Sequence, residues 1–537
     1  MAKNPCTSMI KYTPASERKL PLFSTPFEAG LDPANRWVKM AELVPWDEMA
    51  KVFYKSMSVD QGRGSIDLRV VLGALLVKHI EGISDEDTIQ YIQENVYAQY
   101  FVGLPKFQAA PVFSPTLFVE IRKRLGESGA RQLNDVVLKQ AQRLRAIKHR
   151  AKPRKKSSKG KEGGDGGPEA EPENEAVQNE QPAEEARNKG TLKVDATVAP
   201  QHIGYPTDTR LLQEARLYSE ELIDKLYAGS RLWKKKPRTY RRKAQKEYLA
   251  FARKRKRGKP EIRKMRGKLL RYLRRNLGHI HRMLDKLEQA GQAIPWKYPQ
   301  WRIFWILQEF YRQQDIMHRD GRKRIDNRIV NIFQPYVRPI KRGKGGVKDT
   351  EFGAKLNMSE TEGFARMDQV AFESFHEGNF LEDQIEGYKA LYGYYPELLL
   401  ADRIYLTREN RKYLKDRGIR HSGKPLGRPA EIPRHEKQKR KKEQNKRSEI
   451  EGKFGQAKSK YGLDDILTRR QDTSYACIGL ILLALNLIKL SGVVFVSFFS
   501  YCISLWRVQF YPKLKIDSIG FATGRKWWLK ESFALTA

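Results

Sequence analysis

Three acidic residues stand where carboxylates could act on a phosphate group. Asp195 lies in an alternating polar and apolar segment, 191–198, which is typical of a strand. Asp402 follows an unbroken apolar run, 397–401, typical of a strand buried on both faces. Because ligands in open α/β sheets collect at the carboxyl ends of strands, Asp402 is placed where it could hold a metal ion. The third acid, Glu451, lies in a predicted helix.

That helix carries two cations on the same face as Glu451. At 100° per residue, Arg447 and Lys458 project within about 40° of it. Three carboxylates brought together repel one another unless cations occupy the site. Oxygen ligands without cysteine favour Mg²⁺ or Mn²⁺ over zinc. Two such ions could activate a water molecule or a DNA 3′ hydroxyl for in-line phosphoryl transfer.

Each acid also has a structural explanation. Asp195 could be a solvent-facing strand residue, Asp402 a turn or capping residue, and Glu451 an ion-pair partner of Arg447 four residues earlier. Structural acids outnumber catalytic ones, so each explanation is the commoner one when its residue is taken singly. The order of the three acids and their basic surroundings favour a catalytic site.

The composition indicates an intracellular partner of a polyanion. The chain has 537 residues, and 102 Lys and Arg against 63 Asp and Glu give a net charge of +39. A hydrophobic fraction of 40% excludes a wholly disordered chain, and a mean hydropathy of −0.66 excludes a multi-span membrane protein. The three cysteines, Cys6, Cys477 and Cys502, form neither a disulfide framework nor a thiolate zinc site. Nucleic acid is the expected partner.

Much of the positive charge lies in one segment. Residues 231–280 hold 22 Lys and Arg and two acidic residues, with aromatic residues between them. A long solvated helix pair could carry such charges, but like charges one turn apart repel, which favours contact with phosphates. The predicted DNA contacts are Arg447 and Lys458 beside the acids, and Lys234, Lys235, Lys236, Arg241, Arg242, Arg253 and Arg255 in this segment.

A helical region precedes residue 150. The patterns predict a buried helix over 66–80, a second capped by Ser84 with Ile89 to Tyr100 on its face, and a third after Ser114. The basic run 122–124 suits either a helix-turn-helix DNA reader or an ordinary bundle with a solvated basic face. Both remain open.

The rest of the chain predicts an α/β fold. A flexible linker, 148–190, precedes the strand with Asp195, and a long helical region follows that strand. Further strands are expected at 329–333, 353–358 and 364–370, before the apolar strand at 397–401 and a helix from Thr407 to Gly418. This order predicts a nuclease-like mixed sheet with a helical insertion.

These motifs resemble those of a known family. Val194-Asp195-Ala-Thr, Leu399-Leu-Ala-Asp402 with Tyr405 and Asn410, and Arg447-Ser-Glu-Ile-Glu451 continuing to Lys458 are similar to bacterial insertion-sequence transposases of the DDE class, in the IS-five-like branch of the IS-four superfamily. Residues 68–125 are similar to that branch's N-terminal helical domain, and 423–429 also fits. One departure is Gln444, where the family often has a tyrosine.

The resemblance implies an RNase H-like α/β core, preceded by an all-α domain. Asp195, Asp402 and Glu451 would be the catalytic, metal-binding triad, with two Mg²⁺ or Mn²⁺ ions. It implies a polynucleotidyl transferase that binds the inverted repeats at its element's ends, cleaves the strand and joins the 3′ hydroxyl to target DNA. A homo-oligomer on double-stranded DNA, in the bacterial cytoplasm at the nucleoid, is expected.

The predicted domains are a DNA-binding helical domain at 35–147, the disordered linker at 148–190, a catalytic domain at 191–490 with a basic helical insertion at about 207–327, and an apolar then basic tail at 491–537. Two other functions remain open. One is a catalytically inactive DNA-binding protein derived from a transposase, and the other is a nuclease without a joining step.

Three features are less decisive. The apolar stretch 477–506 predicts a core helix over the sheet, and a membrane anchor is the alternative, although its longest uncharged run falls short of the ~20 residues of a span. We therefore expect no membrane partner. The loop 341–346 lacks the spacing of an ATP-binding loop. His376-Glu377 could lie near the site or in a surface loop.

Overall fold

The computed structural model describes residues 30–54, 66–150, 188–230, 232–341, 350–423 and 433–510, without the side chains of 147–150 and 493–510. The chain divides into two compact units, Met1–Lys489 and Leu490–Ala537. Most of the predicted linker, the motif after Gly423 and the end of the tail lie outside the described residues.

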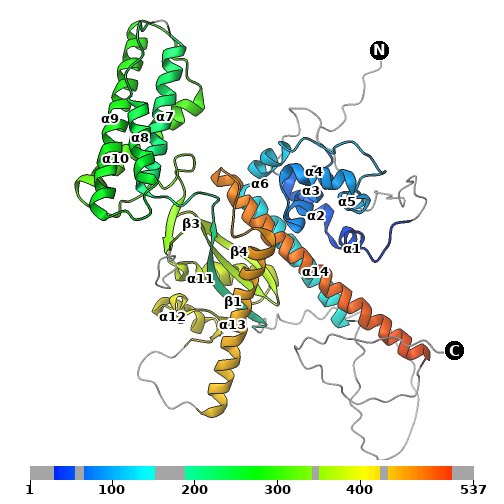
Figure 1. Cartoon of the computed structure of the whole chain (residues 1–537). Coiled ribbons are helices and arrows are strands. Elements are labelled where there is room, and N and C mark those ends of the chain that lie inside the picture. Colours follow the sequence, from blue (N-terminus) through cyan, green and yellow to red (C-terminus); the bar gives the residue numbers. More distant parts are fainter. Residues whose placement is uncertain are drawn as a thin grey trace, which may run out of the picture. The chain divides into compact units, whose positions relative to one another are not determined.

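The N-terminal region is helical, as predicted. Ser84 caps α4 by accepting the amide of Asp87 at 3.0 Å. The predicted second helix does not continue to Tyr100, because the Asn95 side chain accepts the amides of Tyr97 and Ala98 and starts a new helix. The helices are α1 (Arg36–Leu43), α2 (Trp46–Tyr54), α3 (Leu68–Glu81), α4 (Asp85–Glu94), α5 (Val96–Val102) and α6 (Leu117–Arg150), labelled in Figure 1.

The basic run on α6 does not point wholly outward. Arg122 is buried and donates to both carboxylate oxygens of Asp85, at 2.9 and 2.6 Å. Lys123 pairs with Glu120 at 2.5 Å on the same helix. A bidentate, buried ion pair of this kind joins α6 to the start of α4. Arg122 is therefore part of the bundle's packing, in keeping with the bundle interpretation of this run.

A single mixed sheet forms the core of the fold. Its order is β2-β3-β1-β5-β6, and β4 pairs with β3. β1 is antiparallel to β3 and parallel to β5, which is parallel to β6. This is the α/β arrangement of an RNase H-like core. The strands are β1 (Thr191–Pro200), β2 (Arg338–Lys341), β3 (Thr350–Thr361), β4 (Phe364–Ala371), β5 (Leu398–Leu400) and β6 (Arg420–His421).

The predicted strand at 329–333 is wrong. Asn331 accepts the amides of Phe333 and Gln334 at 2.9 Å each, which closes a turn in place of a strand. Ile329 and Ile332 are buried in the core of the helical insertion and not in the sheet. The neighbouring Val330 belongs to the core beside β3 and β4, so the apolar residues of this segment are divided between two cores. The strand that pairs with β3 begins later, at Arg338.

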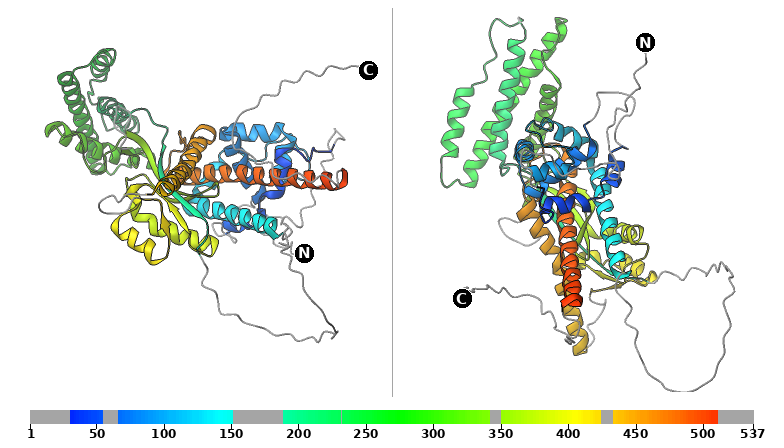
Figure 2. Two further views of the ribbon diagram at one scale, coloured as in Figure 1. Left: turned by 90° about the horizontal axis from the view of Figure 1, so that it is seen from below. Right: turned by 90° about the vertical axis from the view of Figure 1, so that its right-hand side faces the viewer.

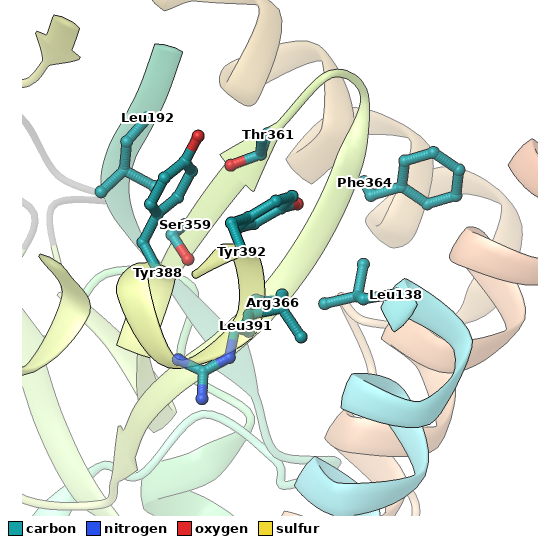
Figure 3. Close-up of a pocket in the computed structure, with 9 residues that line it drawn as sticks. All are labelled: Leu138, Leu192, Ser359, Thr361, Phe364, Arg366, Tyr388, Leu391 and Tyr392. Carbon is teal, nitrogen blue, oxygen red and sulfur yellow. The ribbon is translucent and has the colours of Figure 1, made fainter. Parts of the chain in front are cut away.

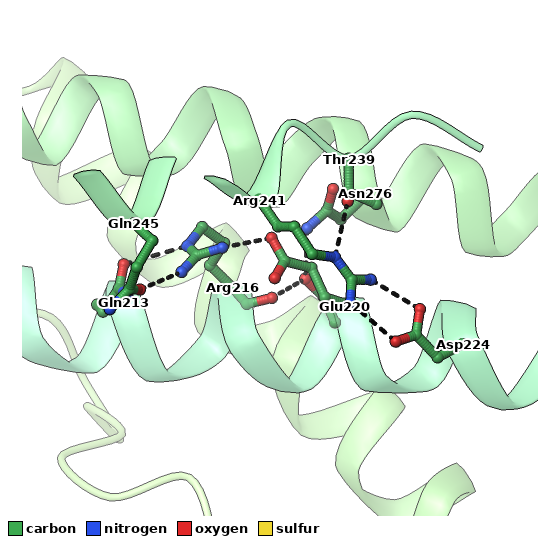
Figure 4. A network of polar contacts seen from close by, with 9 residues as sticks. Gln213, Arg216, Glu220, Asp224, Thr239, Arg241, Gln245 and Asn276 are labelled. Carbon is green, nitrogen blue, oxygen red and sulfur yellow. Dashed lines mark hydrogen bonds and ion pairs between the residues drawn. The ribbon is translucent and has the colours of Figure 1, made fainter. Parts of the chain in front are cut away.

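The described residues between β1 and β2 form four helices: α7 (Asp208–Ala228), α8 (Arg241–Ala252), α9 (Lys259–Gln289) and α10 (Tyr298–Arg319). They lie side by side in both views of Figure 2, in green, around a shared apolar core. A buried polar network crosses this core (Figure 4). Within it, Arg216 pairs with Glu220, and Asn276 donates to Ser219 at 2.8 Å.

Helices cover both faces of the sheet. On one face, α11 (Leu381–Tyr392) and α12 (Arg408–Asp416) share a core with Leu192 and Val194 of β1. On the other face, α13 (Arg434–Tyr461) lies against β1 and β5, and the first part of α14 (Gln471–Phe510) shares an apolar core with β3 and β4. This confirms the predicted core helix over the sheet.

One buried side chain ties α14 to two other elements. Asn486 donates to the Asn134 side chain on α6 at 2.7 Å and to the Ala365 carbonyl on β4 at 2.6 Å. It also accepts the Ala365 amide at 2.9 Å. The segment Gln471–Gly492 is long and apolar enough to cross a membrane, and 67% of its apolar window is buried within the fold, as a core helix would be.

A small cavity lies where the sheet meets α11 and α6. Leu192, Ser359 and Tyr388 are among its lining residues (Figure 3). Its volume is about 10 Å³, which leaves room for one water molecule at most. It is a packing gap and offers no space for a ligand.

Candidate active site

The structure brings the three predicted carboxylates to one side chain. Arg447 lies 3.6 Å from Asp195, 3.3 Å from Asp402 and 3.7 Å from Glu451, measured between guanidinium nitrogens and carboxylate oxygens. Asp195 comes from the middle of β1, Asp402 from the loop after β5, and Glu451 and Arg447 from α13. Residues far apart in the sequence therefore meet over one face of the sheet.

An ion-pair group, buried at Lys193 and Glu360 and exposed at Glu449, joins α13 to β1. Lys193, two positions before Asp195 on the same face of β1, lies 2.5 Å from Glu360 of β3 and 2.5 Å from Glu449 of α13. Sequence reasoning missed this group. Its signal was a lysine within an apolar strand, on the face that also carries Asp195.

Tyr405 and Asn410, which the sequence analysis grouped with Asp402, fix the loop that carries Asp402. Asn410 donates through Nδ2 to the carbonyls of Gly378 and Tyr405, at 2.7 Å each. The Tyr405 hydroxyl donates to Asn357 of β3 at 2.6 Å. Burial raises the pKa of Tyr405, and neighbouring carboxylates raise it further, so the hydroxyl keeps its proton and its role as donor. Both residues act on the position of the loop.

A cavity of about 360 Å³ opens beside the carboxylates. Asp195, Glu451 and the predicted phosphate-binding Lys458 line it. Glu377 lines it as well, and pairs with Lys355 at 2.9 Å. Glu377 therefore lies near the site, which was one of the two positions predicted for His376-Glu377.

Charge crowding and burial act together on Asp195. Burial raises its pKa to about 6, and the charges of Asp402 and Glu377 push in the same direction. The amide of Ala196, at 2.8 Å, and the guanidinium of Arg447 lower it. The charge of Asp195 therefore depends on a nearby cation.

The donor set suits a hard cation, although the described side chains are not gathered as a closed ligand group. Among the residues that the structure describes, no three His, Cys, Asp or Glu side chains are close enough to hold a metal ion. Arg447 lies among the carboxylates instead, and its Nη1 is buried without a hydrogen-bond partner. Three carboxylates that offer only oxygen donors fit Mg²⁺ or Mn²⁺.

The predicted DNA contacts in the helical insertion fall into two groups. Lys236 and Arg241 both pair with Asp224, and Arg241 does so through two hydrogen bonds, at 3.0 and 2.7 Å. The other five are exposed: Lys234, Lys235, Arg242, Arg253 and Arg255.

Comparison with known proteins matches two transposase family models to segments of the chain. A family model described as "Transposase DDE domain" matches residues 399–488, which include Asp402 and Glu451 but not Asp195. A second, described as "Transposase domain", matches residues 26–124. A Rhizobium meliloti protein, "Uncharacterized protein ORF8 in nfe locus", is 28% identical over 204 residues, which cover 37% of this chain and 78% of that protein. No solved structure matches the chain.

Proposed function

We propose that this chain, which belongs to the DDE transposases of bacterial insertion sequences, cleaves DNA at the ends of its own element and joins the freed strand to target DNA. One observation carries the proposal. Carboxylates from β1, from the end of β5 and from α13 converge on Arg447 over one face of an RNase H-like sheet. Phosphoryl transfer on DNA needs such a group of oxygen ligands beside cations that bind phosphate.

In this proposal Asp195, Asp402 and Glu451 would hold the divalent ions. Two Mg²⁺ or Mn²⁺ ions, when bound, would supply activation of the attacking oxygen and stabilisation of the leaving oxygen. Lys458 lines the cavity beside Glu451 and would bind a non-bridging phosphate oxygen. Arg447 would do the same from the other side of Glu451 on the same helix face. Tyr405 and Asn410 keep the Asp402 loop in place.

DNA binding is assigned to two regions. The helical domain at 35–147 would contact the inverted repeats, and the exposed cations of the insertion at about 207–327 would contact the backbone. We further propose that a homo-oligomer forms on the DNA and that the protein works in the cytoplasm, at the nucleoid. The linker, 148–190, would connect the helical domain to the catalytic domain, 191–490.

The test uses duplex DNA that carries the inverted repeats flanking the gene. Wild-type protein with Mg²⁺ should nick this DNA and give strand-transfer products, and EDTA should abolish both. Asp402→Asn should bind the DNA as tightly as wild type and leave it uncut, because the exposed carboxylate has no packing role. Full cleavage by this variant would refute the site.

Two outcomes would favour the other functions. Specific binding by wild type without any metal-dependent nick would identify an inactive DNA-binding protein. Nicking without joined products would identify a nuclease.

A further inference from the structure

A second cavity, which we call the β6 pocket, lies at the end of the sheet's edge strand. Its volume is about 550 Å³, larger than that of the cavity beside the triad. Asp402 follows β5, and the neighbouring parallel strand β6 ends at His421, which lines the pocket together with the next residue, Ser422. The other lining residues come from α12, the loop after β6 and the first half of α13: Arg411, Arg420, Gly423, His435, Glu436, Lys439, Arg440 and Glu443.

The charges of the β6 pocket leave two cations unmatched. Arg420 pairs with Glu443 at 2.5 Å, and Arg440 with Glu436 at 2.7 Å. Within the described part of the chain, no carboxylate pairs with Lys439, which is exposed. Arg411 is half-buried; its Nε donates to the Leu406 carbonyl at 3.1 Å and its Nη1 lies 3.5 Å from Nε2 of His421, but within the described residues no carboxylate pairs with it. The pocket is therefore set to receive negative charge.

His421 faces more donors than it can satisfy. Its Nδ1 lies 3.1 Å from the Gly423 amide, and its Nε2 lies 3.5 Å from Nη1 of Arg411. Both neighbours are N–H donors, whereas a neutral imidazole has a single acceptor nitrogen. Burial and the adjacent Arg411 lower the pKa of His421, which favours that neutral form. Whichever tautomer forms, an N–H of the ring is left beside another N–H donor, with no acceptor between them.

One face of α13 joins the pocket to the active site. At 100° per residue, Glu436, Arg440 and Glu443 lie within about 40° of Arg447, as do Glu451 and Lys458. Lys439 lies about 80° around the helix from Arg447, beside this face, and at 1.5 Å per residue it is about 18 Å along the helix from Glu451. That distance corresponds to about five nucleotides of a B-form strand. A strand lying on this face would reach both places.

We propose that the β6 pocket binds a backbone phosphate of the DNA strand on which the active site acts, through Arg411, the His421 ring N–H and Lys439. A phosphate has the several acceptor oxygens that this set of donors lacks. The position along the strand rests on the proposed function, but phosphate binding by the pocket does not.

The experiment measures the salt dependence of binding of the full chain to fluorescent duplex DNA carrying the flanking inverted repeats. Lys439→Gln should lower the slope of log K against log salt by about 0.9, the value for one lost phosphate contact. Lys441→Gln is the matched control. Lys441 is exposed, lies on the side of α13 opposite Lys439, and does not line the pocket. Its slope should equal that of wild type.

A second measurement locates the phosphate. Single phosphates of each strand are replaced by uncharged methylphosphonates, and one position about five nucleotides from the nick should weaken wild-type binding but not binding by Lys439→Gln. Equal slopes for Lys439→Gln and Lys441→Gln, in proteins of equal Tm, would overturn the proposal. A second outcome would also overturn it: inorganic phosphate raises the Tm of wild type but not that of Lys439→Gln, while the two proteins bind DNA equally. The pocket would then bind free phosphate and not DNA.

The two proposals fail in different ways. If wild type nicks the DNA and the two lysine variants behave alike, the pocket is wrong and the transposase activity stands. If wild type does not nick the DNA but the slope depends on Lys439, phosphate binding by the pocket stands and the catalytic proposal fails.

Discussion

Arg447 contacts acids from three different elements, and this decides how the site behaves without metal. Its side chain is largely buried, as is that of Asp195, whereas Asp402 and Glu451 are more than half exposed. A single cation offsets part of the repulsion among three carboxylates. A divalent ion would bind the same oxygen atoms, so Arg447 and the metal compete for them.

The raised pKa of Asp195 gives a prediction for stability against pH in EDTA. The folded pKa, about 6, lies above the unfolded one, about 3.9, so ionisation costs stability as pH rises through this interval. Asp195→Asn should therefore raise the free energy of unfolding by up to about 3 kcal/mol at pH 7 and by little below about pH 4. Urea unfolding at several pH values measures this. Asp416→Asn, at an exposed position, is the control; a benefit of Asp195→Asn that does not grow with pH would contradict the prediction.

Competition between Arg447 and metal can be tested directly. Arg447→Gln should lower the Tm in EDTA, because three carboxylates lose their shared cation. It should also increase the rise in Tm on adding Mg²⁺, because a ligand stabilises by RT ln(1 + [L]/Kd) and the Kd falls when its competitor is removed. Thermal unfolding across a Mg²⁺ titration measures both. Lys446→Gln makes the same charge change at an exposed neighbour, and an equal Mg²⁺ effect in the two variants would count against the competition.

At the scale of elements, the Lys193 group fixes α13 over the sheet. Lys193→Met leaves Glu360, which is 1% exposed, without its cation, and should lower the free energy of unfolding by about 3–5 kcal/mol. The double variant Lys193→Met with Glu360→Met should recover most of this loss. Glu449→Gln, at an exposed end of the group, should cost at most about 1 kcal/mol. Chemical denaturation provides the values; a double variant as unstable as the single one would show that the ion pair itself carries the stability.

Local signals explain which elements the sequence could predict. Thr407 starts α12 and Ser84 starts α4 through bonds to nearby amides, and β5 is a buried apolar run, so each is specified within a few residues. The edge strand β6 has two residues and forms only because β5 lies beside it. The segment 329–333 is as apolar as a strand, and only tertiary packing places Ile329 and Ile332 in the core of the helical insertion.

The candidate site divides in the same way. The spacing of Arg447, Glu451 and Lys458 on one helix face predicted their shared direction, and the ion pairs place Asp195 and Asp402 beside them. The contacts of Lys193, and the position of Glu377 in one cavity with Asp195, bring together residues more than 150 positions apart. No periodicity in the sequence encodes such distances.

At the scale of the whole molecule, the net charge of +39 is not evenly available. Some cations of the insertion serve the fold, as Lys236 and Arg241 do through Asp224, and Arg275 through the ring of Tyr240. Others, such as Arg242 and Arg253, are exposed and have no carboxylate partner within the described residues. Only the second kind can release counterions from DNA without first breaking an ion pair.

This distinction predicts different effects from equal changes of charge. Arg242→Gln with Arg253→Gln should lower the log–log salt slope of DNA binding by up to about 1.8, or about 0.9 for each phosphate contact, and leave the Tm unchanged. Lys236→Gln with Arg241→Gln removes the same charge but leaves Asp224 unpaired, so it should lower the Tm of the insertion and change the slope less. Anisotropy titrations over a range of salt, with thermal unfolding of each variant, separate the two. Counterion release depends on which cations reach the phosphates, so we expect the two slopes to differ. Equal slopes for both double variants would mean that net charge alone, and not the exposed face of the insertion, governs binding.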